Sequence, residues 1–239
     1  MNDLLQLAID AHGGLERWNQ FQHLDIDVSI DGGIWYVKQQ PRLLIDKRVS
    51  MRTHEEHLTV TPFGGDGLHS VFTPRRLTIE NANGDAVQER DDPEAAFRGQ
   101  TLETAWDALH VVYFSGEALW TYFTMPFLYT TPGFAVEEIA PWHEGGETWR
   151  SLQVTFPEHV ATHNRRQITR FGDDGLIRRH DYTVDILGGA TGAKYTSGYR
   201  DFQGIRLPTV HRVFAYDDAM QKVPEPLLVS IDVSNANFR

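Results

Sequence analysis

The chain has 239 residues, 41% of them hydrophobic and 11% aromatic, which is enough for one large domain with a substantial core. Its 22 basic and 33 acidic residues give a formal net charge of −11. This charge repels nucleic-acid phosphates and anionic lipid surfaces, so neither is expected as a partner. The chain has no cysteine and no apolar stretch of the roughly 18 residues that span a membrane, which excludes thiol catalysis, Cys-based metal sites and a transmembrane helix.

Residues 1–21 are predicted to form two helices. Asn2 or Asp3 can cap the first, apolar residues then recur at helical spacing, and Gly13 ends the pattern. The spacing of three between Leu15 and Trp18 predicts a short second helix. Both helices precede the predicted strands.

The apolar period changes to two over residues 24–30, which predicts a strand. Asp-Gly-Gly at 31–33 is expected to turn the chain into a second strand at 34–37, giving a first hairpin. Turn residues between the later segments favour an antiparallel meander. Its further strands are predicted at residues 42–52, 56–62, 67–73, 75–80 and 85–90.

Residues 101–127 are predicted to form an aromatic helix between two groups of strands. Thr101 or Thr104 can cap this helix, Gly116 is expected to interrupt it, and Pro126 stops it. Its aromatic side chains project to nearly every side, so it is either a buried core helix or one wall of a mostly apolar ligand cavity. In the second case the candidate ligand contacts are Trp106, His110, Tyr113, Trp120 and Phe123.

The rest of the chain returns to strands. No repeat or low-complexity linker divides the sequence, so residues 1–239 are expected to form a single domain. The predicted fold class is α+β, with a long antiparallel sheet and helices packed over one face. The later strands are predicted at 134–140, 147–156, 161–171, 176–187, 193–202, 205–216 and 227–233.

Two segments carry a family resemblance. Residues 11–18 read Ala-His-Gly-Gly-Leu-Glu-Arg-Trp after the first helix, and residues 199–208 read Tyr-Arg-Asp-Phe-Gln-Gly-Ile-Arg-Leu-Pro. Together with the meander, they resemble the lipoprotein-carrier-like superfamily, which includes the bacterial lipoprotein localisation factors. The resemblance covers most of the chain in outline. It implies an incomplete β-barrel whose helices close the open side over a greasy cavity.

The chain departs from that family in two respects. Charged residues interrupt its first ten positions, so we expect no export signal there, and its interior is expected to be more charged than an acyl-chain cavity requires. We therefore expect the fold and the cavity of the family in a cytoplasmic protein, without lipoprotein transport.

Residues 161–186 are expected to form a hairpin with unusually polar arms. If the loop after Phe171 has two or four residues, odd positions of the first arm share a face with even positions of the second. That face is the more apolar one and is expected to point inward, whereas a three-residue loop would reverse the pairing. Its polar members are His163, Arg165, Gln167, Arg178, His180 and Tyr182.

Two interpretations of this face remain. If it is inward, Arg165 and Arg178 need carboxylates or an anionic ligand, because an unpaired buried charge is costly, and Gln167 completes a polar wall. If it is solvated, the arginines make only weak cross-strand pairs. The candidate catalytic groups are His180, Tyr182 and His163, which are suited to acid–base chemistry.

A metal site is not expected. His159, His163 and His180 have a ligand-like spacing, but an extended hairpin separates His163 from His180 by roughly 13–20 Å, too far for one ion with bonds of about 2 Å. No nucleotide- or phosphate-binding motif is present, so no cofactor is expected.

Three functions fit these features. The first is binding of a hydrophobic or amphipathic, anionic small molecule in a half-barrel cavity. The second is a cofactor-independent enzyme of cyclase, isomerase or hydratase type that acts on a hydrophobic metabolite in the same cavity. The third is a protein interaction module. Binding is favoured, because the resemblance implies a cavity while the sequence shows no complete catalytic constellation.

Overall fold

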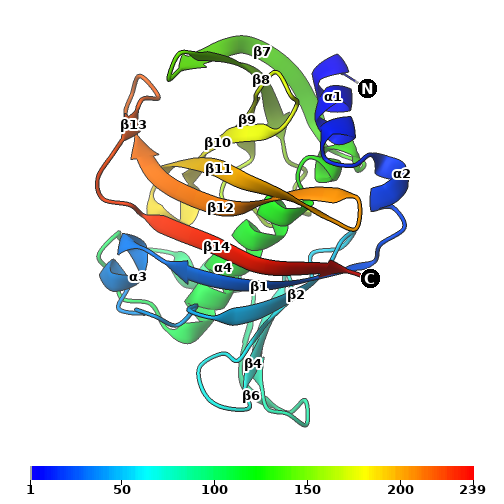
Figure 1. The fold of residues 1–239 in the computed structure, drawn as a ribbon. Helices are drawn as coiled ribbons and strands as arrows, with labels where there is room; N and C mark the ends of the chain where they lie inside the picture. The colour runs from blue at the N-terminus through cyan, green and yellow to red at the C-terminus, as the bar shows by residue number, and fades with distance from the viewer. Residues whose placement is uncertain (1) are drawn as a thin grey trace.

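One antiparallel sheet extends through the structure, which is a computed structural model that describes residues 2–239 (Figure 1). The strands of the first half are β1 (His23–Asp31), β2 (Lys47–Arg52), β3 (Leu58–Thr61), β4 (His69–Phe72), β5 (Arg76–Glu80) and β6 (Ala86–Asp91). Those of the second half are β7 (Ala135–Glu144), β8 (Glu147–Thr155), β9 (Arg166–Phe171), β10 (Ile177–Val184), β11 (Ala190–Phe202), β12 (Ile205–Tyr216), β13 (Lys222–Val223) and β14 (Val229–Phe238).

The strand order confirms the predicted fold class. Neighbouring strands follow the order β6-β5-β4-β3-β2-β1-β14-β12-β11-β10-β9-β8-β7, and β13 pairs with β12 outside this path. Each half is a meander, and β14 joins the halves by pairing with both β1 and β12. Because β6 and β7 do not pair with each other, the sheet is an incomplete barrel with two edges.

The helix α4 (Ala108–Thr124) carries the chain between those edges. It follows β6 and precedes β7, and in Figure 1 it lies behind β14 and β1, inside the curve of the sheet. Every residue from Leu109 to Thr124 is buried, as expected for a helix that is apolar on all sides. Helix α4 therefore fills the interior of the incomplete barrel.

The structure corrects three details of this helix. It begins at Ala108, so Trp106 precedes it, and its N-terminus is capped by Asp107 rather than by a threonine. It is not interrupted at Gly116. A side chain at Gly116 would place its Cβ 2.3 Å from a ring carbon of Phe72, so the glycine serves close packing against β4.

The N-terminal helices are confirmed as α1 (Asp3–Ala11), capped by Asn2, and α2 (Leu15–Trp18). The end of α1 lies against the β11–β12 turn. A Cβ at Gly13, whose φ is +118°, would lie 2.1 Å from the carbonyl oxygen of Gly204, and the Arg17 Nε donates to the carbonyl of Gln203 at 2.7 Å. The two segments that carry the family resemblance are thus in direct contact.

The predicted strand at 34–37 is wrong, because these residues form the helix α3 (Gly33–Val37). The backbone N–H of Gly33 donates to the carbonyl of Leu227, and that of Ile34 donates to Leu228. These bonds hold the chain against the segment that precedes β14. The sheet neighbours of β1 are consequently β2 and β14.

Candidate functional site

The β9–β10 hairpin has the inward face that the sequence predicted, for a different reason. The N–H of Gly172 donates to the carbonyl of Leu176 at 3.0 Å and closes a loop of three residues, 173–175. The loop therefore has the length that, by itself, would reverse the pairing of faces. A β-bulge at Arg178 then shifts the register by one residue and places His180 opposite Thr169. The bulge compensates for the loop and restores the predicted pairing of faces.

The interior side of β10 holds two buried groups of hydrogen-bonded side chains. The His180 Nδ1 lies 2.9 Å from the hydroxyl of Thr169, and its Nε2 lies 2.7 Å from the Oε1 of Gln167. The hydroxyl groups of Tyr182 and Tyr122 are 2.5 Å apart. Burial lowers the pKa of His180 well below its ordinary value, so its imidazole is neutral. Both of its nitrogens have hydrogen-bond partners.

His163 enters this cluster from the loop before β9. Its Nδ1 lies 2.7 Å from the Oε1 of Glu117 on α4, and both side chains are buried. Its ring centroid is 4.7 Å from that of Tyr182, which in turn is 5.6 Å from that of His180. The imidazoles are therefore closer together than the 13–20 Å expected from an extended strand, because residue 163 lies outside the strand.

Glu117 was missed from sequence. Burial raises the pKa of its carboxyl group, while the charge and the hydrogen bond of His163 oppose that rise. A lone acidic residue in an otherwise apolar helix was the available signal. It indicates a carboxyl group that must have a buried partner.

The two predicted inward arginines are placed elsewhere. The guanidinium of Arg165 donates to the carbonyl groups of Pro157 and Val160, so it stabilises its own loop. Arg178, displaced by the bulge, donates to Asp174 at 2.8 Å near the surface. Neither forms the polar wall that the sequence predicted, because each has local partners.

Part of the opposite face of the hairpin is buried as well. Arg170 and Arg179 both donate to Asp181, at 2.9 and 2.6 Å, and Arg179 also pairs with Glu144 at 2.8 Å. The indole ring of Trp142 covers the two guanidinium groups. This network joins β10 to the end of β7, and its two arginines are buried rather than solvated.

The aromatic candidates around α4 are mostly structural. The Trp106 Nε1 donates to Gln100, and His110 completes the capping box with Asp107. Tyr113 and Phe123 are buried, Tyr113 against Phe72 and Phe97 and Phe123 against His211. Trp120 differs, because it both donates to the carbonyl of Arg52 at 2.9 Å and lines a surface groove.

Three hollows surround the helix. The void directly beneath α4 has a volume of about 30 Å³, and Tyr122, His163 and Tyr182 belong to its lining. A recess of about 190 Å³ reaches His163 from outside, past Tyr113 and Arg165. The largest hollow is a groove of about 660 Å³ beside the C-terminal half of α4. The cavity expected beneath the helix is thus almost filled, and the large hollow lies beside the helix instead.

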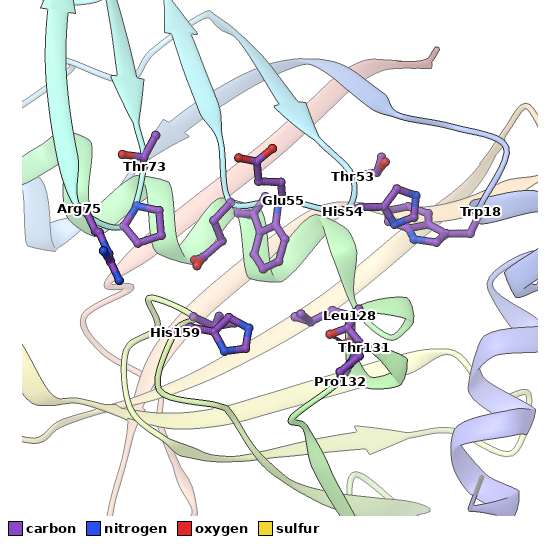
Figure 2. A pocket seen from close by; sticks show the side chains of 14 residues that line it. Trp18, Thr53, His54, Glu55, Thr73, Arg75, Leu128, Thr131, Pro132 and His159 are labelled. Carbon is purple, nitrogen blue, oxygen red and sulfur yellow. Dashed lines mark hydrogen bonds between the residues drawn. The ribbon is translucent and has the colours of Figure 1, made fainter.

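The groove separates the loops of the two halves of the sheet. Figure 2 shows His159, Leu128, Thr131 and Pro132 on one side and Thr53, His54 and Glu55 on the other. Its apolar lining includes Trp18, whose indole stacks on Phe127 with the ring centroids 4.4 Å apart. The complete lining is Trp18, Thr53, His54, Glu55, Glu56, Thr73, Pro74, Arg75, Trp120, Leu128, Thr131, Pro132, His159 and Val160.

Glu56 is the buried carboxyl group of this groove. The side chain lies in the β2–β3 loop, and the residue is 8% exposed. Its Oε2 accepts a hydrogen bond from the backbone N–H of Ala161 at 2.9 Å, while its buried Oε1 has no hydrogen-bond partner among residues 2–239. Burial raises the pKa of Glu56 to about 8. The groove therefore combines apolar walls with one incompletely satisfied acidic group.

Within residues 2–239, no group of three or more His, Asp or Glu side chains is arranged to hold a metal ion. No helix in the same range is long and apolar enough to cross a membrane.

Comparisons with known proteins identify the fold. No family model matches the chain, and no curated protein matches it. A DUF1329 family protein from Desulfovibrio piger is 14% identical with a TM-score of 0.56, and the match covers 98% of this chain and 91% of that one. A putative outer membrane lipoprotein-sorting protein domain from Vibrio parahaemolyticus is 8% identical with a TM-score of 0.55, covering 98% and 92%.

A LolA superfamily protein from Nitrosomonas europaea is 10% identical with a TM-score of 0.54, and the match covers 98% of this chain and 92% of that one. At these identities the likeness concerns the fold alone. The chain therefore has the lipoprotein-carrier-like fold that its two sequence segments predicted.

Proposed function

We propose that this protein binds a hydrophobic or amphipathic small molecule in the groove beside α4. The carrying observation is the groove itself, with its volume of about 660 Å³ and its lining by Trp18, Trp120, Leu128 and Val160. Small-molecule sites typically have about 300–1,000 Å³ and combine apolar walls with a few polar groups. The fold likeness to a putative lipoprotein-sorting domain supports a ligand with an alkyl portion.

The proposed site lies beside the aromatic helix rather than beneath it. The void of about 30 Å³ under α4 is large enough for about one water molecule and not for an alkyl chain. The expected preference for an anionic ligand loses its basis, because Arg165 and Arg178 have other partners. The location in the cytoplasm stays a prediction.

A calorimetric titration with an uncharged amphiphile tests this proposal. Monodecanoylglycerol below its critical micelle concentration is expected to bind with one site per chain. Thr131 lines the groove, so Thr131→Trp should fill part of it and weaken binding at least tenfold. Thr130→Trp is the matched control, because Thr130 is exposed, lies outside the groove lining and makes an equivalent hydroxyl contact to a carbonyl three residues earlier.

Equal binding to the wild type and to Thr131→Trp would place the ligand elsewhere. No binding of the neutral amphiphile to the wild type would contradict the function itself. Thermal unfolding of both variants verifies that each is folded before the titration.

A second candidate function, an enzyme, is favoured by the Glu117–His163 pair. A buried carboxyl group that engages Nδ1 orients the ring and leaves Nε2 as the nitrogen available to a substrate, as in hydrolytic dyads. His163 also lines both the outer recess and the inner void, and its ring lies next to that of Tyr182. Of the three predicted catalytic residues, it is the one that borders a recess open to solvent.

Accessibility of His163 decides whether this second function can be retained. A reagent that acylates imidazole, diethyl pyrocarbonate, should modify His163 in the native protein, and more slowly in Glu117→Gln because the ring loses its carboxylate. Exposed His159 should react equally in both proteins. Absence of modification at His163 would exclude a substrate from reaching it through the recess.

A further inference from the structure

We infer that the groove takes a cationic amphiphile, with Glu56 as the counter-ion of its ammonium head. This inference rests on the proposed binding function and names the ligand class. It reverses the charge that the sequence suggested. The observations that carry it are the position of Glu56 in the groove lining, its unpartnered oxygen, and the engagement of Arg52 and Arg165 by other partners.

The geometry of Glu56 leaves one acceptor for a ligand. The bond from the Ala161 N–H fixes Oε2 and joins the β2–β3 loop to the loop before β9. Oε1 is buried without a partner among residues 2–239. Buried polar atoms are nearly always hydrogen-bonded, because desolvation without a partner is unfavourable. A donor from a ligand in the groove would supply the missing bond.

A charged donor fits better than a neutral one. An ammonium group forms charge-assisted bonds to a carboxylate, and it tolerates aromatic surroundings such as the neighbouring Trp120 ring. The net charge of −11 attracts cations to the molecule. Alkyl chains attached to the ammonium group would lie along the apolar lining, which includes Leu128 and Val160.

The arginines near the groove offer less to an anion. Arg165 donates to carbonyl groups of its own loop, and Arg52 pairs with Glu55. Arg75 lines the groove and is exposed, so its charge is screened by water. An anionic amphiphile held by Arg75 is the competing outcome that the experiment must separate.

Ammonium binding should displace a proton from Glu56. Without a ligand, burial holds the pKa of this carboxyl at about 8, so it is mostly protonated at pH 7. A bound cation favours the ionised form, and the proton leaves to the buffer. The titratable and charged groups that face Glu56 or share its groove are His54, Glu55, Arg75, Tyr113, Glu117, His159 and Arg165.

The test compares three ten-carbon ligands of different head charge: decylammonium, decanoate and monodecanoylglycerol. At pH 7 we expect decylammonium to bind at least tenfold more tightly than decanoate. Glu56→Gln should abolish this preference while leaving monodecanoylglycerol binding within twofold. Glu89→Gln is the matched control and should keep the preference, because Glu89 is exposed, pairs with Arg76 and lies outside the groove lining.

A measurement on the unaltered protein covers the case in which Glu56→Gln does not fold. The enthalpy of decylammonium binding at pH 7 should vary with the ionisation enthalpy of the buffer, with a slope that approaches one released proton per ligand. Equal or tighter binding of decanoate, or no proton release, would overturn the ammonium assignment alone. Failure of all three ligands to bind would instead contradict the proposed function.

Discussion

At the scale of single residues, two buried carboxyl groups distinguish this molecule. Burial raises the pKa of both Glu56 and Glu117. Glu117 could have been recognised from sequence, as the one acidic residue in an apolar helix. Glu56 could not, because it follows Glu55 in an irregular loop. Its burial depends on Ala161, which is 105 positions away in sequence.

The ionisation of Glu56 should be visible in the stability of the free protein. Its pKa is about 8 in the folded state against 4.5 as the ordinary value, so the folded state binds the extra proton between these pH values. The free energy of unfolding should therefore fall as pH rises through this range, by at most about 1.4 kcal/mol per pH unit.

Urea titrations of the wild type and Glu56→Gln from pH 5 to 8.5 measure this contribution. The variant should gain stability relative to the wild type as pH increases. Buried histidines such as His180 change the stability in the opposite direction, mainly below pH 6.5, because their pKa is lowered. This contribution is the same in both proteins and cancels in the comparison. A constant difference between the two proteins across this range would show that Glu56 does not titrate as described.

At the scale of secondary-structure elements, periodicity predicted most strands and the helices α1 and α2. It could not predict irregularities. The bulge at Arg178 inserts one residue into β10, and no local pattern marks it, because Ile177 and Arg179 are both acceptable strand residues. Similarly, Gly116 was expected to break α4, since propensity contains no information about Phe72 on β4.

Substitution of Gly116 tests the packing of α4 against β4. Alanine favours helices by about 1 kcal/mol over glycine, but overpacking of a filled core costs about 1–3 kcal/mol. Because the new Cβ would lie 2.3 Å from the Phe72 ring, we expect the overpacking to prevail and Gly116→Ala to lower the free energy of unfolding by up to about 2 kcal/mol.

Denaturant unfolding provides the measurement, and the Phe72→Leu background provides its control. The penalty of Gly116→Ala should be smaller when the ring is absent, since the shorter side chain leaves room for the methyl group. Stabilisation by Gly116→Ala in the wild-type background would mean that α4 and β4 are not in the described contact.

At the scale of the whole molecule, the fold was accessible from sequence and the groove was not. The alternation of apolar and polar residues, together with two short segments, predicted an incomplete barrel. The solved structures with this fold match it over 98% of the chain. The groove brings together side chains from α2, α4 and several separate loops. Its composition depends on how the two halves of the sheet approach each other, which periodicity within a strand does not encode.

The most direct test of ligand binding is photo-crosslinking with an uncharged long-chain alcohol that carries a diazirine near its end, followed by peptide mapping. The account predicts adducts at the groove lining, residues 18, 53–56, 73–75, 120, 128, 131–132 and 159–160, and their loss in Thr131→Trp but not in Thr130→Trp. Adducts concentrated instead at the exposed apolar residues Tyr36 and Leu102, or unchanged in Thr131→Trp, would contradict it.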